Sequence, residues 1–282
     1  VICDKPLCMN LEEARLLEAL VERSGLLFGL THNYSGYPMV KEARRRVRSG
    51  ELGAIRRVVA EYAQGWLATP LEAAGQKQAQ WRTDPKRTGA SCCMGDIGTH
   101  AAHLAEYVTG LRIEEVSADL ATFVEARELD DDGSVLLRLE RGARGVLWAS
   151  QVAIDEENGL RIRVYGDKGG LEWCQEEPNT LVLKWLERPR ETLRTGINHT
   201  TLSAEALGSS RLPAGHPEGY IEAFANIYRN FAMTLSDRLS GAPPQPERLD
   251  FPTVQDGVRG MAFIEAVVES SAGEKKWTKI PA

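Results

Sequence analysis

Four consecutive segments in the middle of the chain alternate apolar and polar side chains with a period of two, and this pattern constrains the fold most strongly. Between residues 114 and 187 they read EEVSADLATFV, DGSVLLRLERGARGVLWASQVAI, GLRIRVYGDKGGLEWCQ and NTLVLKWLE. Such alternation is typical of strands that bury one face, and turns such as Arg141-Gly142 and Gly166-Asp167 join neighbouring strands. The sequence therefore predicts a large, mainly antiparallel sheet.

A strand–helix–strand pattern opens the chain. The apolar VIC precedes a helix over LEEARLLEALVERSG, which Asn10 can cap and Gly25 can end, and the apolar run LLFGLTHNY follows. One such unit suggests the end of a parallel sheet, so residues 1–35 are interpreted as the remnant of an α/β domain. Because the chain opens inside an apolar segment, we expect further sequence upstream of it.

Residues 36–282 are predicted to form one α+β domain, an open sheet flanked by helices. Helical patterns cover MVKEARRRVRSGELG, GYIEAFANIYRNFAMTLSDRLSG and TVQDGVRGMAFIEAVVESS, and a further helix runs from about Asp96 to Val108. The segment IRRVVAEYAQGWL is a predicted strand, and a short strand ends the chain. Residues 68–95 and 189–218 are predicted loops.

Charge and cysteine usage narrow the functional classes. The net charge is −6 and the pI is near 5.6, which gives no electrostatic case for nucleic acid or an anionic membrane. No apolar run reaches the ~18 residues of a membrane span. The five cysteines include no CxxC pair, which favours a reducing cytoplasm. The basic run KEARRRVRSG at 41–50 is interpreted as a solvated helix face with a possible subunit or phosphate contact.

Three residues could carry acid–base chemistry. Lys5 follows an apolar strand, where open α/β sheets bind ligands, although a surface lysine is the simpler interpretation. Asp96 and His100 lie four residues apart in GDIGTH, so a helix would place them on one face. A carboxylate beside a histidine fixes its tautomer and raises its basicity, which suits proton transfer from a hydroxyl. On these two residues alone, an ordinary helix start is the better interpretation, with an aspartate stabilised by the helix dipole and a buried, hydrogen-bonded histidine one turn later.

Other chemistries have weaker support. Asp96, His100 and His103, with Cys92 and Cys93 upstream, offer metal-ligand types, but HExxH and CxxC spacings are absent and no metal is predicted. No GxSxG marks a nucleophile, and no GxGxxG cradles a pyrophosphate.

Together the motifs resemble the Gfo/Idh/MocA family of oxidoreductases, typified by glucose-fructose oxidoreductase and inositol dehydrogenase. DKP at 4–6 is similar to the family's EKP turn, and QWRTDPKRTGASCCMGDIGTH at 80–100 to its WR-x-DP…D-x-G-x-H segment. The resemblance runs nearly end to end. It implies that residues 1–35 are the end of a Rossmann domain and that 36–282 bind substrate and oligomerise. It also implies that this chain alone, without the main cofactor-binding loop, is inactive and binds no dinucleotide tightly.

The family's functional residues are carried over position by position. The resemblance implies that Lys5, Asp96 and His100 are catalytic, that Lys5 and Pro6 lie against NAD or NADP, and that Trp81 and Arg82 lie at the pocket rim. The implied reaction is hydride transfer between nicotinamide and a sugar or polyol hydroxyl carbon, with Lys5 and His100 relaying the proton. Cys92 and Cys93 replace glycines common in the family, and His103 replaces a residue that is often acidic there.

Two loops remain specific to this chain. The family arrangement places His32, Asn33 and Tyr34 in GLTHNYSGYP, and His216 in RLPAGHPEGY, around the pocket for hydroxyl recognition. The alternative is that Tyr37 and Pro38 only turn the chain and that His216 and Pro217 precede a helix start. A homodimer or homotetramer through the open sheet is expected. The alternative function is a non-catalytic module that binds a sugar or mediates oligomerisation.

Overall fold

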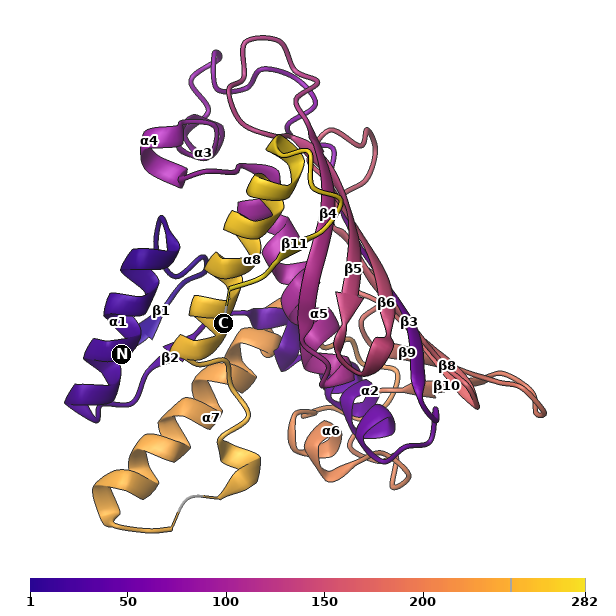
Figure 1. Cartoon of the computed structure of the whole chain (residues 1–282). Helices are drawn as coiled ribbons and strands as arrows, with labels where there is room; N and C mark the ends of the chain where they lie inside the picture. Colours follow the sequence, from indigo (N-terminus) through magenta and orange to yellow (C-terminus); the bar gives the residue numbers. More distant parts are fainter. Residues whose placement is uncertain (244, 282) are drawn as a thin grey trace.

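The computed structural model describes residues 1–243 and 245–281, and a nine-stranded sheet dominates it (Figure 1). The strand order is β10-β9-β8-β7-β3-β6-β5-β4-β11, and every neighbouring pair is antiparallel except β3 and β6. The prediction of a large, mainly antiparallel open sheet is confirmed. Its strands are β3 (Ile55–Ala63), β4 (Ile113–Ala121), β5 (Asp132–Leu139), β6 (Arg144–Ser150), β7 (Gly159–Gly166), β8 (Gly169–Cys174), β9 (Thr180–Trp185), β10 (Glu191–Arg194) and β11 (Thr278–Lys279).

The parallel pair lies at the centre of the sheet. β3 comes early in the chain and inserts between β6 and β7, pairing Val58 with Gly145 on one side and with Val164 on the other. The alternation pattern identifies β6 and β7 as strands, but it carries no information on a partner far upstream. The loop after β6 therefore passes over the end of β3 before β7 begins.

Helices cover one face of this sheet. α5 (Thr99–Thr109) packs against β3 and β7, with Ala101, Leu104 and Val108 fully buried. α2 (Pro38–Arg48) lies beside α5, and α8 (Val254–Ala272) packs against α5 and β4 (Figure 1). The remaining helical elements are α3 (Lys77–Arg82), α4 (Pro85–Thr88), α6 (Ala204–Gly208), α7 (Tyr220–Ser240), and the short helices η1 (Asn33–Gly36), η2 (Met94–Gly98), η3 (Glu140–Gly142) and η4 (Pro246–Arg248).

The opening strand–helix–strand unit forms a separate two-stranded parallel sheet. β1 (Ile2–Cys3) pairs with β2 (Gly29–Leu30), and α1 (Leu11–Ser24) connects them. The Asn10 side chain accepts from the Glu13 amide, and Gly25 ends the helix with φ 63°, as predicted. Within the predicted strand LLFGLTHNY only Gly29–Leu30 is a strand. Residues 33–36 turn into η1, where the Gly36 carbonyl accepts from Asn226 of α7.

Three further sequence predictions need correction. The loop predicted over 68–95 contains α3 and α4. The loop predicted over 189–218 contains β10 and α6, the latter capped by the Ser203 hydroxyl. The basic run at 41–50 is also more than a solvated face. Lys41 and Arg44 pair with Asp250, and two further arginines, Arg45 and Arg46, pair with acidic side chains at positions 42 and 51. None of the helices within the described residues is long and apolar enough to cross a membrane.

Candidate active site

A cavity of about 470 Å³ lies where the β1 turn meets η2, the start of α5 and the end of β3. It brings together five of the residues nominated from sequence, namely Lys5, Tyr34, Arg82, Asp96 and His100. These come from segments far apart in the chain. The full lining is Lys5, Tyr34, Tyr62, Gln64, Trp66, Gln76, Gln78, Arg82, Asp96, Ile97, His100, Asn158 and Tyr220.

An ion pair between Lys5 and Asp96 organises this cavity. The Lys5 Nζ donates to Oδ1 of Asp96 at 2.9 Å and to the Asp96 carbonyl oxygen at 2.5 Å. Both side chains are largely buried, with 17% and 12% of their surfaces exposed. The simpler interpretation of Lys5, a free surface lysine, is therefore wrong, because its ammonium is paired with Asp96. Its ammonium is held at a fixed point beside the cavity.

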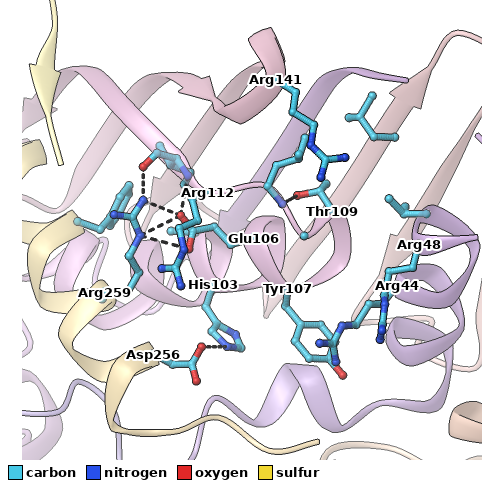
Figure 2. Close-up of a pocket in the computed structure, with 18 of the residues that line it drawn as sticks. Arg44, Arg48, His103, Glu106, Tyr107, Thr109, Arg112, Arg141, Asp256 and Arg259 are labelled. Carbon is cyan, nitrogen blue, oxygen red and sulfur yellow. Dashed lines mark hydrogen bonds and ion pairs between the residues drawn. The ribbon is translucent and has the colours of Figure 1, made fainter. Parts of the chain in front are cut away.

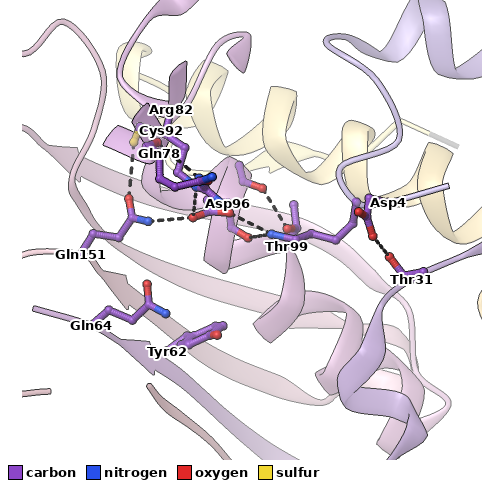
Figure 3. Close-up of polar contacts among 12 residues, drawn as sticks. Asp4, Thr31, Tyr62, Gln64, Gln78, Arg82, Cys92, Asp96, Thr99 and Gln151 are labelled. Carbon is purple, nitrogen blue, oxygen red and sulfur yellow. Dashed lines mark hydrogen bonds and ion pairs between the residues drawn. The ribbon is translucent and has the colours of Figure 1, made fainter. Parts of the chain in front are cut away.

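The other oxygen of Asp96 is also fully engaged. Oδ2 accepts from Arg82 Nε at 2.9 Å and from the amide nitrogen of Gln151, Nε2, at 2.9 Å (Figure 3). Burial alone would favour the neutral acid, but Lys5 and Arg82 outweigh it and hold the pKa of Asp96 below its usual value. Asp96 is thus a carboxylate shared by two cations, and the structure assigns no Asp96–His100 hydrogen bond. The expected orientation of His100 by Asp96 is wrong.

Asp96 reaches this position because the helix does not begin regularly. Residues Met94–Gly98 form a π-helical turn before α5 rather than the predicted α-helix from Asp96. Buried Asp130 holds the start of this turn, because its carboxylate accepts from the Cys92 amide at 3.0 Å, the Met94 amide at 2.9 Å and the Ser91 hydroxyl at 3.0 Å. Such π-turns occur frequently at functional sites.

His100 lies in a strongly desolvated environment. Its Nδ1 is buried without a hydrogen-bond partner. Burial, followed by the charges of Lys5 and two neighbouring histidines, holds the pKa of His100 well below 6.5. The sequence argument expected a carboxylate to raise its basicity, and the structure gives the opposite direction. His100 is therefore neutral near pH 7.

His32 lies behind His100 and does not line the cavity. Its ring contacts His100 edge-on at 5.4 Å between centroids and stacks on His103 at 4.2 Å. Burial, with His103 and Lys5, also holds the pKa of His32 well below its usual value. We conclude that His32 supports the His100 ring rather than offering a group to a ligand.

Neutral polar groups form the wall opposite Asp96. The hydroxyls of Tyr34 and Tyr62 hydrogen-bond to each other, and Tyr62 donates to Asn158 Oδ1 at 2.7 Å. Gln64 donates to the same oxygen at 2.7 Å. Burial raises the pKa of both tyrosines, so the phenols stay protonated. This wall can donate to and accept from hydroxyl groups, but it carries no charge.

Besides His32, the nominated substrate residues Trp81 and His216 lie outside the cavity lining. Trp81 stacks on the Arg82 guanidinium, 4.2 Å from its ring centroid, and the indole of Trp66 lines the cavity in its place. His216 is exposed and contacts the Pro213 carbonyl, while Tyr220, the first residue of α7, reaches the cavity. The Lys5–Pro6 peptide bond is cis.

The sequence argument missed most of the neutral wall. Tyr62, Gln64, Trp66 and Asn158 lie at or beyond strand ends, which is the same signal that identified Lys5, but they belong to no motif. Cys92 and Cys93 are buried, and Cys92 contacts Gln151 rather than the cavity. Across residues 1–243 and 245–281, no group of three or more His, Cys, Asp or Glu side chains is placed to hold a metal ion.

Comparison with known proteins identifies the relatives of this chain. The family model described as the GFO/IDH/MocA C-terminal domain matches residues 40–172. An uncharacterized oxidoreductase of Bacillus subtilis, YfiI, is 32% identical over 281 residues, covering 99% of this chain and 71% of the relative. Levoglucosan dehydrogenase of Pseudarthrobacter phenanthrenivorans is 25% identical, covering 100% and 74%.

A solved structure extends the likeness to the fold. The inositol dehydrogenase homolog of Azotobacter vinelandii, complexed with NAD+, superimposes with a TM-score of 0.92 at 35% identity, covering 99% of this chain and 72% of the other. The same protein, complexed with NADH and myo-inositol, gives a TM-score of 0.86 at 34% identity, with 99% and 71% covered.

Proposed function

Because the chain belongs to the Gfo/Idh/MocA family of NAD-dependent sugar and polyol dehydrogenases, we propose that it provides the substrate site for oxidation of a neutral polyol or sugar hydroxyl by NAD. The observation that carries the proposal is the Lys5–Asp96 pair beside neutral His100 in one cavity. Lys5, Asp96 and His100 are the proposed catalytic residues, and Tyr34 and Arg82 belong to the proposed substrate site.

The position of Lys5 fits the nicotinamide end of such a cofactor. Ligands of doubly wound sheets lie beyond the carboxyl ends of parallel strands, and Lys5 follows β1 at that edge of the β1–β2 pair. Lys5 and Pro6 would therefore contact the nicotinamide side. When bound, NAD supplies the acceptor for the hydride. The chain's own residues bind the polyol and handle the hydroxyl proton.

Lys5 and His100 have different parts in the transfer of the hydroxyl proton. Lys5, held by two hydrogen bonds to Asp96, offers a positive charge and its remaining N–H donor to the reacting oxygen, which becomes more negative as its proton leaves. Neutral His100 accepts that proton. Arg82 and Gln151 act as positioning residues, because they fix the carboxylate that fixes Lys5.

The substrate is expected to be uncharged. Among the described residues, Lys5 and Arg82 are the only fixed cations that line the cavity, and both are paired with Asp96. The opposite wall consists of phenols and amides, which match hydroxyl groups. A phosphate or carboxylate on the substrate would be desolvated here without a free cationic partner.

We therefore predict that kcat/KM for myo-inositol exceeds that for an inositol monophosphate by about 10²-fold or more, since an unpaired charge costs at least as much as a missing hydrogen bond. The measurement is steady-state NADH formation by the intact protein with each substrate, and with a panel of neutral hexoses. Equal kcat/KM values for the neutral and phosphorylated substrates would contradict this account of the cavity.

The pH dependence of kcat/KM tests the proposed role of His100 as the base, independently of the choice of substrate. A base must be deprotonated to accept a proton, and burial holds the pKa of His100 well below 6.5. The acid limb of log kcat/KM against pH should therefore lie below about pH 6.5, so that activity stays constant between roughly pH 7.5 and 6.5. In a His32→Ala variant this limb moves to higher pH, because the space left beside the His100 ring admits water and reduces the desolvation that disfavours protonated His100. An acid limb centred at or above pH 6.5 in the wild type rejects His100 as the base.

A further inference from the structure

A second and larger cavity, of about 900 Å³, opens on the other side of α5 (Figure 2). Its walls are the end of α2, the C-terminal half of α5, the first turns of α8 and the turns that lead into β3, β4 and β6. It shares no lining residue with the candidate active site. Its volume lies in the range of small-molecule sites.

Five arginines and two carboxylates line this cavity, in a chain whose net charge is −6. Two of the arginines are already neutralised. Arg259 binds Glu106 through both Nε and a terminal nitrogen, and Arg44 binds Asp250 and lies over the Tyr107 ring. The other three arginines in the lining are Arg48, Arg112 and Arg141.

Arg48, Arg112 and Arg141 are exposed at the cavity, and within the described residues their guanidinium groups take no hydrogen bond or ion pair. They come from three separate elements: the end of α2, the turn between α5 and β4, and η3. Figure 2 places Arg141 at the top of the opening, Arg112 on the Arg259 side and Arg48 on the Arg44 side. Like charges gathered around one opening repel each other unless an anion lies between them.

Asp256, the second carboxylate in the lining, does not neutralise these three arginines. Asp256 uses Oδ2 to accept from the amide and hydroxyl of Thr253, and so caps α8. Its Oδ1 faces His103 Nε2 at 3.9 Å. Burial lowers the pKa of His103, so that side chain adds no charge at neutral pH. The cavity therefore keeps an excess of positive charge from three unpaired arginines.

We propose that this cavity binds a small organic molecule that carries two or more phosphate groups. Arginine presents a planar fork of N–H donors that matches phosphate oxygens. A phosphate offers three acceptor oxygens in different directions, so it can take forks from separate walls, whereas a carboxylate offers two in one plane. Arginines on opposite sides of a 900 Å³ opening suit a ligand with separated phosphates.

The site is remote from substrate chemistry but shares one helix with it. α5 carries His100 toward the candidate active site and His103, Glu106 and Tyr107 toward the arginine-lined cavity. A bound phosphate ester would contact this helix from the opposite side. The assignment itself depends only on the arginine-lined cavity and stands apart from the proposed dehydrogenase activity.

The test is isothermal titration of the intact protein with inorganic pyrophosphate at low salt, where screening is weak. We expect measurable binding in the wild type and a dissociation constant at least tenfold higher in an Arg112→Gln/Arg141→Gln double variant. Both arginines are exposed, so thermal melting of the double variant should match the wild type. Citrate, titrated in parallel, should bind at least tenfold more weakly than pyrophosphate.

Two matched variants define the controls. Arg23→Gln on exposed α1 removes one charge far from the cavity, and Lys5→Met changes only the active site. Both should bind pyrophosphate like the wild type. The proposal is overturned if pyrophosphate fails to bind, if Arg23→Gln weakens binding as much as the double variant, or if Lys5→Met abolishes it. Citrate binding as tight as pyrophosphate overturns the assignment to phosphate. None of these outcomes bears on the dehydrogenase activity.

Discussion

Replacing Lys5 with methionine is expected to lower kcat for polyol oxidation by about 10²–10⁴, the usual range for acid–base groups. Methionine keeps the unbranched stem but removes the ammonium that the Asp96 carboxylate holds beside the cavity. The reacting oxygen then develops negative charge without a cation next to it. Since the interaction strengthens as the proton leaves, kcat should fall far more than KM rises.

Steady-state kinetics of the intact protein measure this effect, and His100→Ala should lie in the same range. Lys86→Met is the matched control, because Lys86 is exposed on α4 and outside the cavity lining. Circular dichroism melting separates lost catalysis from lost folding. A Lys5→Met enzyme with kcat within threefold of wild type would remove Lys5 from the catalytic step.

The second large effect concerns stability. Asp130→Ala is expected to lower the free energy of unfolding by about 3 kcal/mol or more, because it leaves two backbone amides and a hydroxyl buried without an acceptor. The same change frees the π-turn that positions Asp96, so activity should fall together with stability. Asp130→Asn keeps one acceptor oxygen and should lie between wild type and Asp130→Ala.

Urea unfolding followed by fluorescence provides the measurement. Asp119→Ala is the control, since Asp119 is exposed on β4, and its change should stay within about 0.5 kcal/mol. If Asp130→Ala unfolds at the same urea midpoint as Asp119→Ala, Asp130 does not hold the turn.

The fold was largely predictable because its signals are local. Period-two alternation identified the strands from β4 to β9, and Asn10 with Gly25 gave the limits of α1. The insertion of β3 between β6 and β7 was not predictable in the same way, since pairing across a long sequence separation leaves no local pattern. Only the three-dimensional structure supplies it.

The candidate site was predictable as a set of residues but not as a set of contacts. Motifs nominated Lys5, Asp96 and His100, and all three line one cavity. Helical spacing suggested that Asp96 pairs with His100, yet Asp96 instead binds Lys5, which lies 91 residues away in sequence. Electrostatics explains the choice, because a buried carboxylate gains more from a cation than from a neutral imidazole.

The placement of β3 also sets an order on folding. This strand is synthesised well before β6 and β7, yet both of its hydrogen-bonding edges belong to them. Until they arrive, VVAEYA exposes two unpaired edges of an apolar strand, the kind of segment that associates between chains. Assembly of the central sheet must therefore wait for long-range contacts, and the slow step of folding is expected to be the docking of β3 into the later hairpins.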